Sequence, residues 1–501
     1  MIITLNENKN NGSPSLVSFS ILFGLYKVFR TEPAAWIAFA ILLHAINAFF
    51  VFFVSKKISE ILFGSLGNWF PFFPALLFLI SPYQTEAVLW QPANLPVLLA
   101  VLFFLGSLLL QVNYFLKRRT ITLFFSFLFF LLAAFSYESA LVLPAVSFMV
   151  FILIRKKLKI ELSAAQFIMK MLIPQAGIIF LYMAASKLLF GEWLWHGGVV
   201  EIAVPFSSIA GTMLKYFAKF FLFFRYIPGA AENNSMRELF AHKEYLIAGF
   251  VMICTAAIFI FYFLKRKNNK EWIFISVLFS CFLVSLVPVL PLDSSFLNYI
   301  YPDRYGYLPS VFFYFFISSA IFFLFRKYAM PVLLGYAMLC LILLMKTIPV
   351  WISANEYCNN MIDDYKSFLS CERVYVLDVP AYYNGVPAFR SGFRPTMNFK
   401  YGIPLEKIRF ITGSYHDTAS DSLTSVIMDS GFVKVTGPKR NAPYFSTDGG
   451  QAKSYETDEF KVSFDSLRCS YQIQFKKPVP ANSAFIYPSG KKWKKLELAA
   501  Q

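Results

Sequence analysis

Long apolar runs constrain this chain more than any other feature. Hydrophobic residues make up 57% of its 501 residues and charged residues only 15%, whereas soluble domains carry about 25% charged residues. Many of the runs reach about 18 residues, the length of a membrane-crossing helix. They are too long and continuous for barrel strands, and a bilayer requires every backbone polar group to be bonded internally. We therefore predict a polytopic α-helical membrane protein.

The runs predict about ten membrane spans. They lie at 34–55, 69–82, 95–115, 120–136, 140–154, 166–187, 245–264, 272–290, 308–325 and 330–349. Short basic clusters between the runs give their orientation, because cytoplasmic loops are rich in Lys and Arg. These clusters are Lys56-Lys57, Lys117–Arg119, Arg155–Lys157, Lys265–Lys267 and Arg326-Lys327. With the clusters inside, the segments 81–94, 136–139, 188–244 and 291–307 face outside, together with everything after 350.

The net charge of +17 does not indicate nucleic-acid binding, because the basic residues are spread over many short clusters rather than gathered on one face. Two apolar segments, 15–30 and 206–228, are predicted to be interfacial helices on the outer surface, the second of them alternatively re-entrant. The segment 206–228 carries Lys215, Lys219 and Arg225. These residues are expected either to attract an anionic lipid head group or to form the polar face of an ordinary amphipathic helix.

Residues 351–501 differ in character from the membrane part, residues 1–350. Charged and polar residues return, and a helix over Asn355–Leu369 is expected to continue out of the membrane. Alternating apolar residues then predict strands at Arg373–Val379, Lys407–Thr412, Phe432–Thr436, Glu459–Phe464, Tyr471–Phe475 and Ala484–Tyr487. We expect an extracytoplasmic α/β or β-rich C-terminal domain.

Four segments in the membrane part combine polar and aromatic residues where lipid-facing sequence would be apolar. They are LLHAINA (Leu42–Ala48), SPYQTEAVLWQ (Ser81–Gln91), SYES followed by ALVLP (from Ser136), and DRYGYLPS (Asp303–Ser310). Ionisable groups at membrane depth are costly unless they face a partner or a polar cavity. A short solvated loop is the simpler interpretation of Ser81–Gln91, because polar residues and Trp also gather at ordinary membrane interfaces.

In this order, the four segments resemble motifs of the GT-C-fold integral membrane glycosyltransferases, in particular the transmembrane-and-TPR protein O-mannosyltransferase group and its bacterial relatives. The resemblance covers roughly residues 14 to 330. It implies a GT-C-like fold and transfer of a sugar from a polyprenyl phosphate to a protein or glycan acceptor on the outer face. It also implies a bacterial inner-membrane or endoplasmic-reticulum location, and the lack of a tetratricopeptide array favours the bacterial one.

The chain departs from the family pattern at several positions. Ser81 and Gln84 stand where two His are usual, and Tyr137 stands where a Lys is usual. A divalent metal therefore stays an open question, and no Cys or His has zinc-type spacing. The family's first helix and its acidic external loop have no counterpart here. We expect that the chain begins late in the family pattern or is a catalytically degenerate member.

The resemblance and the residue chemistry nominate catalytic and phosphate-binding groups. Glu86 and Glu138 are the candidate catalytic carboxylates that would orient or deprotonate the acceptor. The alternative for Glu86 is a loop acid that caps a helix. Arg304 would bind the lipid phosphate, as Arg does in bidentate fashion; the alternative is a boundary Arg that snorkels, with Tyr305 and Tyr307 in an aromatic belt.

Four further residues are candidates for substrate binding: Asp303 and Tyr305 beside Arg304, Trp90 beside the Glu86 segment, and His196 in the long outer loop. His44 is predicted to be a hydrogen-bonded packing residue, with Asn47 on the same helical face marking a polar helix–helix contact.

The sequence excludes several other function classes and leaves two open. It contains no P-loop, glycine-rich nucleotide fingerprint, HExxH or GxSxG, which disfavours a cytoplasmic nucleotide-sugar enzyme. The first alternative is a non-catalytic GT-C relative that binds a glycan or a protein. The second is a transporter of lipid-linked glycans, although no pair of Gly- or Pro-broken spans occurs in corresponding halves.

Overall fold

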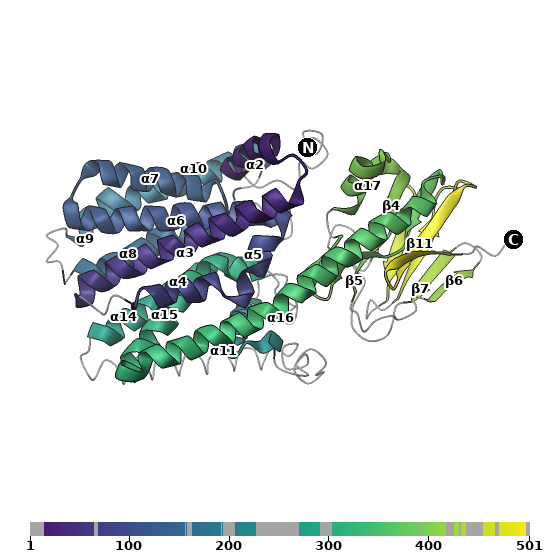
Figure 1. Ribbon diagram of the computed structural model, residues 1–501. Coiled ribbons are helices and arrows are strands. Elements are labelled where there is room, and N and C mark those ends of the chain that lie inside the picture. The colour runs from purple at the N-terminus through teal and green to yellow at the C-terminus, as the bar shows by residue number, and fades with distance from the viewer. Residues whose placement is uncertain are drawn as a thin grey trace. The chain divides into compact units, whose positions relative to one another are not determined.

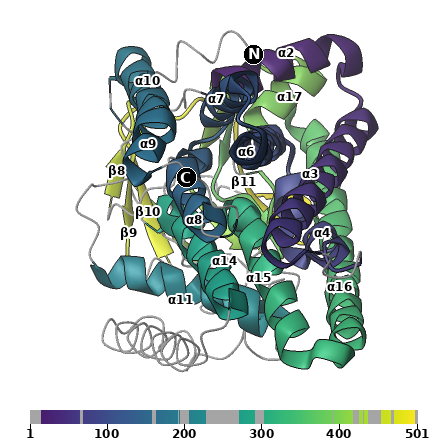
Figure 2. The same cartoon turned by 90° about the vertical axis from the view of Figure 1, so that its left-hand side faces the viewer.

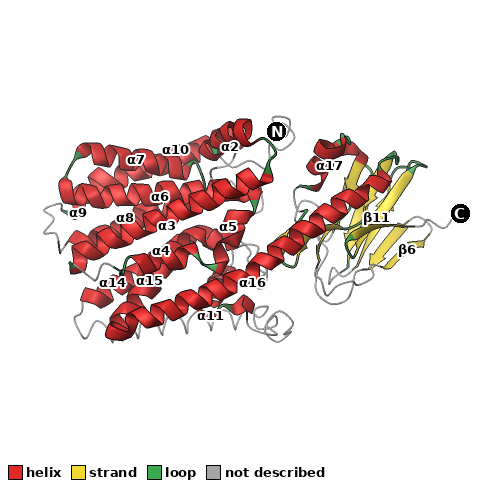
Figure 3. Ribbon diagram, viewed as in Figure 1, coloured by secondary structure: helices red, strands yellow, loops and turns green. Residues whose placement is uncertain are grey.

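The computed structural model of the chain describes residues 15–64, 69–155, 157, 163–191, 193, 206–226, 270–290, 303–389, 392–416, 425–429, 432–436, 454–465 and 470–496. The chain divides into two compact units, Met1–Met345 and Lys346–Gln501. The first unit is built of helices, and all described strands lie in the second (Figures 1 and 3).

The helices of the first unit follow the predicted apolar runs. They are α2 (Leu16–Phe29), α3 (Pro33–Phe63), α4 (Phe72–Leu79), α5 (Thr85–Leu89), α6 (Gln91–Lys117), α7 (Thr120–Ala134), α8 (Leu143–Arg155), α9 (Ala164–Phe167), α10 (Ile173–Phe190), α11 (Phe206–Leu222), α14 (Lys270–Leu286), α15 (Tyr307–Phe325) and α16 (Ala329–Asp364), the last of which continues into the second unit. Local signals set several ends. Pro33 begins α3 and Gly64, with φ 73°, ends it, because Pro suits the first helical turn and Gly tolerates positive φ.

Six of the described helical segments are long and apolar enough to cross a membrane, or up to seven if a bent pair is one span. The bent pair is Phe72–Leu79 with Pro82–Leu89. The ten predicted spans are therefore not confirmed. The run at 120–136 forms α7, which has 15 residues, and the runs at 308–325 and 330–349 fall within one helical segment, Asp303–Phe368. The run at 245–264 lies outside the described residues.

Helix α6 packs against α7 and α3, and α15 packs against α14 and α4, as the end-on view in Figure 2 shows for α6 and its neighbours. Aromatic side chains fill this core; among them Phe312, Phe313 and Phe315 of α15 are buried. A polar helix–helix contact was predicted at His44 and Asn47, and both are buried in α3. The sequence therefore anticipated the helices better than the number of times they cross the membrane.

The contact between α6 and α7 is close at Gly106. A Cβ there would lie 2.5 Å from Phe129 Cδ1 and 2.7 Å from Cε1, so the Phe129 ring would have to move. We expect Gly106→Ala to lower the free energy of unfolding by about 1–3 kcal/mol, the usual cost of overpacking. Gly335→Ala on α16 is the matched control, because nothing lies within 4 Å of a Cβ at that position. Thermal unfolding in detergent measures both, and equal shifts would contradict the close packing at Gly106.

The second unit contains strands at all six predicted segments. Its elements are α17 (Phe393–Tyr401), β1 (Arg373–Val376), β2 (Val379–Tyr383), β3 (Val386–Pro387), β4 (Ile408–Phe410), β5 (Gly413–His416), β6 (Ser425–Asp429), β7 (Phe432–Thr436), β8 (Ser454–Glu456), β9 (Phe460–Phe464), β10 (Ser470–Phe475), β11 (Ser483–Ser489) and β12 (Lys492–Lys495). The predicted helix at Asn355–Leu369 is the end of α16 and the short turn that follows it.

Three sheets organise these strands. Their orders are β12-β11-β1-β4, β6-β7-β10-β9-β8 and β3-β2-β5. In the first, β1 runs parallel to both β11 and β4; the second is antiparallel throughout its described pairs. Tyr375 of β1 stacks on Phe485 of β11 with ring centroids 4.9 Å apart, and both join the buried cluster formed by β7, β9 and β10. A shared core therefore joins the first two sheets, as expected for an α/β domain.

Candidate functional site

The first feature of the site is a bend that turns Glu86 into the protein interior. Helix α4 and the segment Pro82–Leu89 meet at 56°. Pro82 has no N–H to continue the helix, and the Ser81 hydroxyl accepts a hydrogen bond from the Tyr83 N–H at 3.3 Å instead. Helix α5 restarts at Thr85, which places the fully buried Glu86 in its first turn.

Both carboxylate oxygens of Glu86 bind Arg304. Its backbone N–H donates to Oε2 at 2.7 Å and its guanidinium donates to Oε1 at 2.5 Å. The guanidinium lies over the rings of Trp90, at 4.6 Å, and Tyr305, at 4.3 Å, and donates to the Tyr305 hydroxyl at 2.8 Å. Arg304 is only 8% exposed. The alternative of a boundary Arg that snorkels to the surface is therefore wrong, because the carboxylate and the two rings hold its side chain inside.

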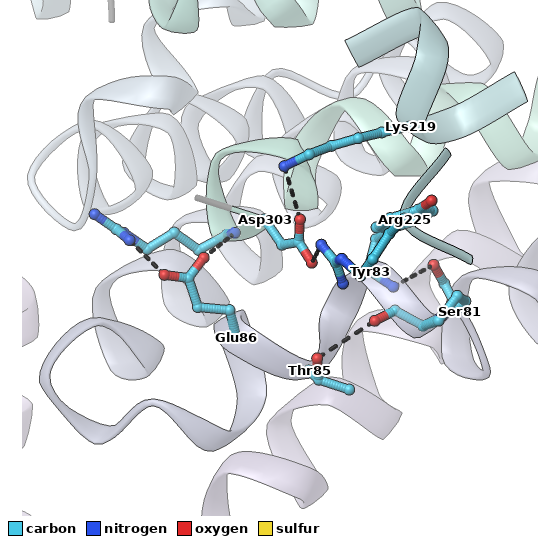
Figure 4. A network of polar contacts seen from close by, with 9 residues as sticks. Ser81, Tyr83, Thr85, Glu86, Lys219, Arg225 and Asp303 are labelled. Carbon is cyan, nitrogen blue, oxygen red and sulfur yellow. Dashed lines mark hydrogen bonds and ion pairs between the residues drawn. The ribbon is translucent and has the colours of Figure 1, made fainter. Parts of the chain in front are cut away.

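Asp303, the neighbour of Arg304, forms a second ion-pair group. Its carboxylate accepts hydrogen bonds from Lys219 at 2.9 Å and from Arg225 at 2.5 Å. Figure 4 shows Asp303 between these two cations, with Glu86 nearby. Burial lowers the pKa of Lys219, and Asp303 opposes that shift. We refer to these five buried residues, Glu86, Lys219, Arg225, Asp303 and Arg304, as the charged cluster.

The sequence missed the partners of Asp303. Lys219 and Arg225 were expected either to attract a lipid head group or to form the polar face of an amphipathic helix, but their side chains are only 4% and 9% exposed and bind Asp303. The close approach of α11 depends on Gly306, where a Cβ would lie 3.0 Å from Phe220. The glycine at position 306 of the DRYG segment could therefore have indicated that another helix packs closely against this segment.

The LLHAINA segment reaches the same region through hydrogen bonds. Asn47 donates to the Tyr307 hydroxyl at 3.1 Å and to the Leu98 carbonyl at 3.0 Å. His44 Nε2 lies 3.1 Å from the Leu79 carbonyl and Nδ1 lies 2.7 Å from the Tyr307 hydroxyl. Because a carbonyl only accepts, Nε2 carries the proton and Nδ1 accepts from Tyr307. The prediction of a hydrogen-bonded packing histidine is confirmed, and the alternative of an aromatic belt at Tyr307 is wrong, since this residue is fully buried.

Two further hydrogen bonds join the Ser81–Gln91 segment to α15. Gln84 donates to the Ser310 hydroxyl at 2.6 Å, and the Tyr314 hydroxyl donates to Ser81 at 2.6 Å. Ser81 and Gln84 stand where the GT-C glycosyltransferases that the sequence resembles usually have His. Here both serve as helix-to-helix hydrogen-bonding residues.

Glu138 lies at the start of the turn Glu138–Val142. Its neighbour Tyr137 is half-buried, and the charged groups near enough to affect its hydroxyl are Glu138, Arg304 and Glu86. The segment that begins at Ser136 therefore borders the charged cluster as well. His196 lies outside the described residues.

The charged cluster is unsuited to a metal ion in this arrangement. Both carboxylates are bound by cations, and the described part of the chain holds no group of three or more His, Cys, Asp or Glu that could bind a metal. The cluster joins three basic and two acidic side chains through short ion pairs. An anionic ligand would have to compete with these carboxylates for the cations.

No family model, curated protein or solved structure matches this chain. The function must therefore be argued from the cluster itself. Its Arg304 offers a planar donor group between two rings, which suits a phosphate, and its carboxylates could accept a proton once an anion replaces them on the cations.

Proposed function

We propose that this chain is a GT-C-like membrane glycosyltransferase that moves a sugar from a polyprenyl phosphate to a hydroxyl of a protein or glycan acceptor. One observation carries the proposal. The four segments that resemble the family's motifs meet at or beside one buried charged cluster, although Glu86 and Arg304 are 218 residues apart and His44 and Tyr307 are 263 apart.

In the proposed reaction the acceptor oxygen attacks the anomeric carbon while the bond from that carbon to the phosphate oxygen breaks, with inversion. The phosphate leaves with the bonding electron pair, and Arg304 stabilises its negative charge. The acceptor proton passes to a carboxylate, for which Glu86 is the first candidate and Glu138 the second. Binding of the phosphate to Arg304 would release Glu86 for this role, because the two anions compete for the same guanidinium.

The arrangement of basic residues supports a site on the outer face. In Figure 1 the turn between α6 and α7 and the turn between α15 and α16 lie at one end of the first unit, and α5 lies at the other. The two turns carry Arg118-Arg119 and Arg326-Lys327. Since cytoplasmic loops are rich in basic residues, we place Glu86 near the extracytoplasmic face, most consistently that of a bacterial inner membrane, with the C-terminal unit outside.

The direct test supplies a polyprenyl phosphate that carries a radiolabelled sugar to membranes containing the chain. We expect label to appear in the protein or glycan fraction, and membranes lacking the chain are the control. Label above the control supports transfer. Label that enters sealed vesicles while it stays on lipid would instead support a lipid-linked glycan transporter.

A second candidate is a non-catalytic relative that binds a lipid-linked glycan or a partner protein. The observation that favours it is that both oxygens of Glu86 are bound by Arg304 and both of Asp303 by Lys219 and Arg225. Saturable binding of the donor lipid without any transferred label would identify this alternative.

A further inference from the structure

The hydroxyl of Tyr83 is buried without a hydrogen-bond partner among the described residues. The whole residue is 2% exposed. Buried polar atoms are almost always hydrogen-bonded, and each exception calls for an explanation. The ring of Tyr83 is firmly placed, with Phe220 at 5.7 Å, Phe223 stacked at 6.2 Å and the Arg225 guanidinium over its face at 5.1 Å.

Two more phenols share neighbours with Tyr83. The Phe223 ring stacks on Tyr83 at 6.2 Å and lies 5.8 Å from the Tyr336 ring, and the Ser81 hydroxyl contacts both the Tyr83 N–H and the Tyr314 hydroxyl. The three hydroxyls come from the bend after α4, from α15 and from α16. The Tyr314 hydroxyl donates to Ser81, so it still offers its lone pairs as an acceptor. Neutral hydroxyls thus lie among aromatic rings, with Arg225 at one side.

The phenols adjoin the charged cluster through Arg225, which contacts the Tyr83 ring and binds Asp303 (Figure 4). A phosphate bound at the charged cluster would lie beside these phenols, because Arg225 belongs to the cluster and contacts Tyr83. Hydroxyls both donate and accept, and they match a group rich in hydroxyls rather than a second charge. Aromatic faces such as those of Phe220 and Phe223 suit the apolar face of a sugar ring.

We propose that Tyr83, Tyr314 and Tyr336 form the subsite for the sugar of the donor lipid, with the Tyr83 hydroxyl bonding a sugar hydroxyl. This inference rests on the proposed function and deepens it, because it separates sugar recognition from phosphate recognition. Its ligand is a neutral hexose on a phosphate, held at a place distinct from Arg304.

The test compares two lipids on the full chain in detergent, by native mass spectrometry. The probes are a polyprenyl phosphate that carries a neutral hexose and the same polyprenyl phosphate without sugar. Tyr83→Phe removes only the hydroxyl, so we expect it to weaken binding of the sugar-bearing lipid about tenfold, the worth of one hydrogen bond, and to leave the sugar-free lipid unchanged. Tyr114→Phe removes a hydroxyl from another buried tyrosine of the first unit and is expected to change neither.

Unchanged binding of both lipids by Tyr83→Phe would overturn the subsite while leaving the proposed function standing. Equal weakening of binding for the two lipids would also overturn the subsite, because Tyr83 would then affect phosphate binding or the fold. Thermal unfolding of the variant distinguishes these two causes. If the unaltered chain binds neither lipid, the proposed function fails and the subsite fails with it.

Discussion

Arg304→Ala is expected to abolish sugar transfer and to lower the free energy of unfolding by about 3–5 kcal/mol. Removal of one partner of a buried ion pair leaves the other charge uncompensated, and that is its usual cost. Here the residue left behind is Glu86, which is fully buried and would keep only the backbone N–H at position 304. Thermal unfolding in detergent measures the stability, and the labelled-lipid assay measures transfer.

Two companion variants separate the structural role of Arg304 from the proposed catalytic one. Arg304→Lys keeps the charge but loses the planar group that contacts Trp90 and Tyr305, so we expect most activity to be lost. Glu86→Gln combined with Arg304→Met removes both charges and keeps an amide oxygen for the backbone N–H. This pair is expected to recover most of the stability, since neutral replacements of buried ion pairs are often tolerated. If Arg304→Ala unfolds with the same free energy as the unaltered chain, the buried ion pair between Glu86 and Arg304 is contradicted.

Asp303→Asn is expected to have the second largest effect. It leaves Lys219 and Arg225 without their carboxylate. Lys219 can lose its proton, because burial already lowers its pKa, but an Arg side chain stays charged. We therefore expect the free energy of unfolding to fall by about 3 kcal/mol, mainly because the charge of Arg225 is left without a partner. We also expect faster hydrogen exchange in α11. Exchange measured by mass spectrometry over 206–226 reports this directly.

Asp363→Asn is the matched control for this variant. Asp363 also binds lysines, with Lys400 at 2.9 Å, but its side chain is 55% exposed, and exposed ion pairs contribute about 0–1 kcal/mol. We expect no measurable change in the first unit. The double variant Asp303→Asn, Arg225→Met removes the buried guanidinium as well. Slow hydrogen exchange of α11 in this variant would show that the unpaired guanidinium causes the loss of stability. Equal exchange in Asp303→Asn and the unaltered chain would show that α11 does not depend on Asp303.

Periodicity and length predicted much of the fold. Apolar runs located the helices, and alternation located the strands β7, β9 and β10, because each face of those strands meets a different environment. The order of strands in the three sheets did not follow from the sequence, since the pairing of β1 with β11 joins residues more than a hundred positions apart. The sequence also did not determine the number of membrane crossings. A run such as Thr120–Ala134 is apolar, but its helix is short for a membrane span.

The charged cluster was predicted in part. Glu86, Asp303, Arg304, Tyr305 and Trp90 were all chosen from motifs and lie together. Lys219 and Arg225 were expected to face lipid head groups or solvent instead, because the basic spacing in an amphipathic segment is the same when the cations face a buried carboxylate. Only the three-dimensional approach of α11 to Gly306 distinguishes the two, and the sequence pattern alone does not contain it.

The measurement that tests the central claim most directly is sugar transfer by the Glu86→Gln, Arg304→Met chain after its folding has been verified. The account predicts that this variant unfolds near the temperature of the unaltered chain, that the unaltered chain transfers label from the polyprenyl phosphate, and that the variant transfers none. Transfer by the folded variant at the rate of the unaltered chain would contradict the account, because the charged cluster would then be structural only.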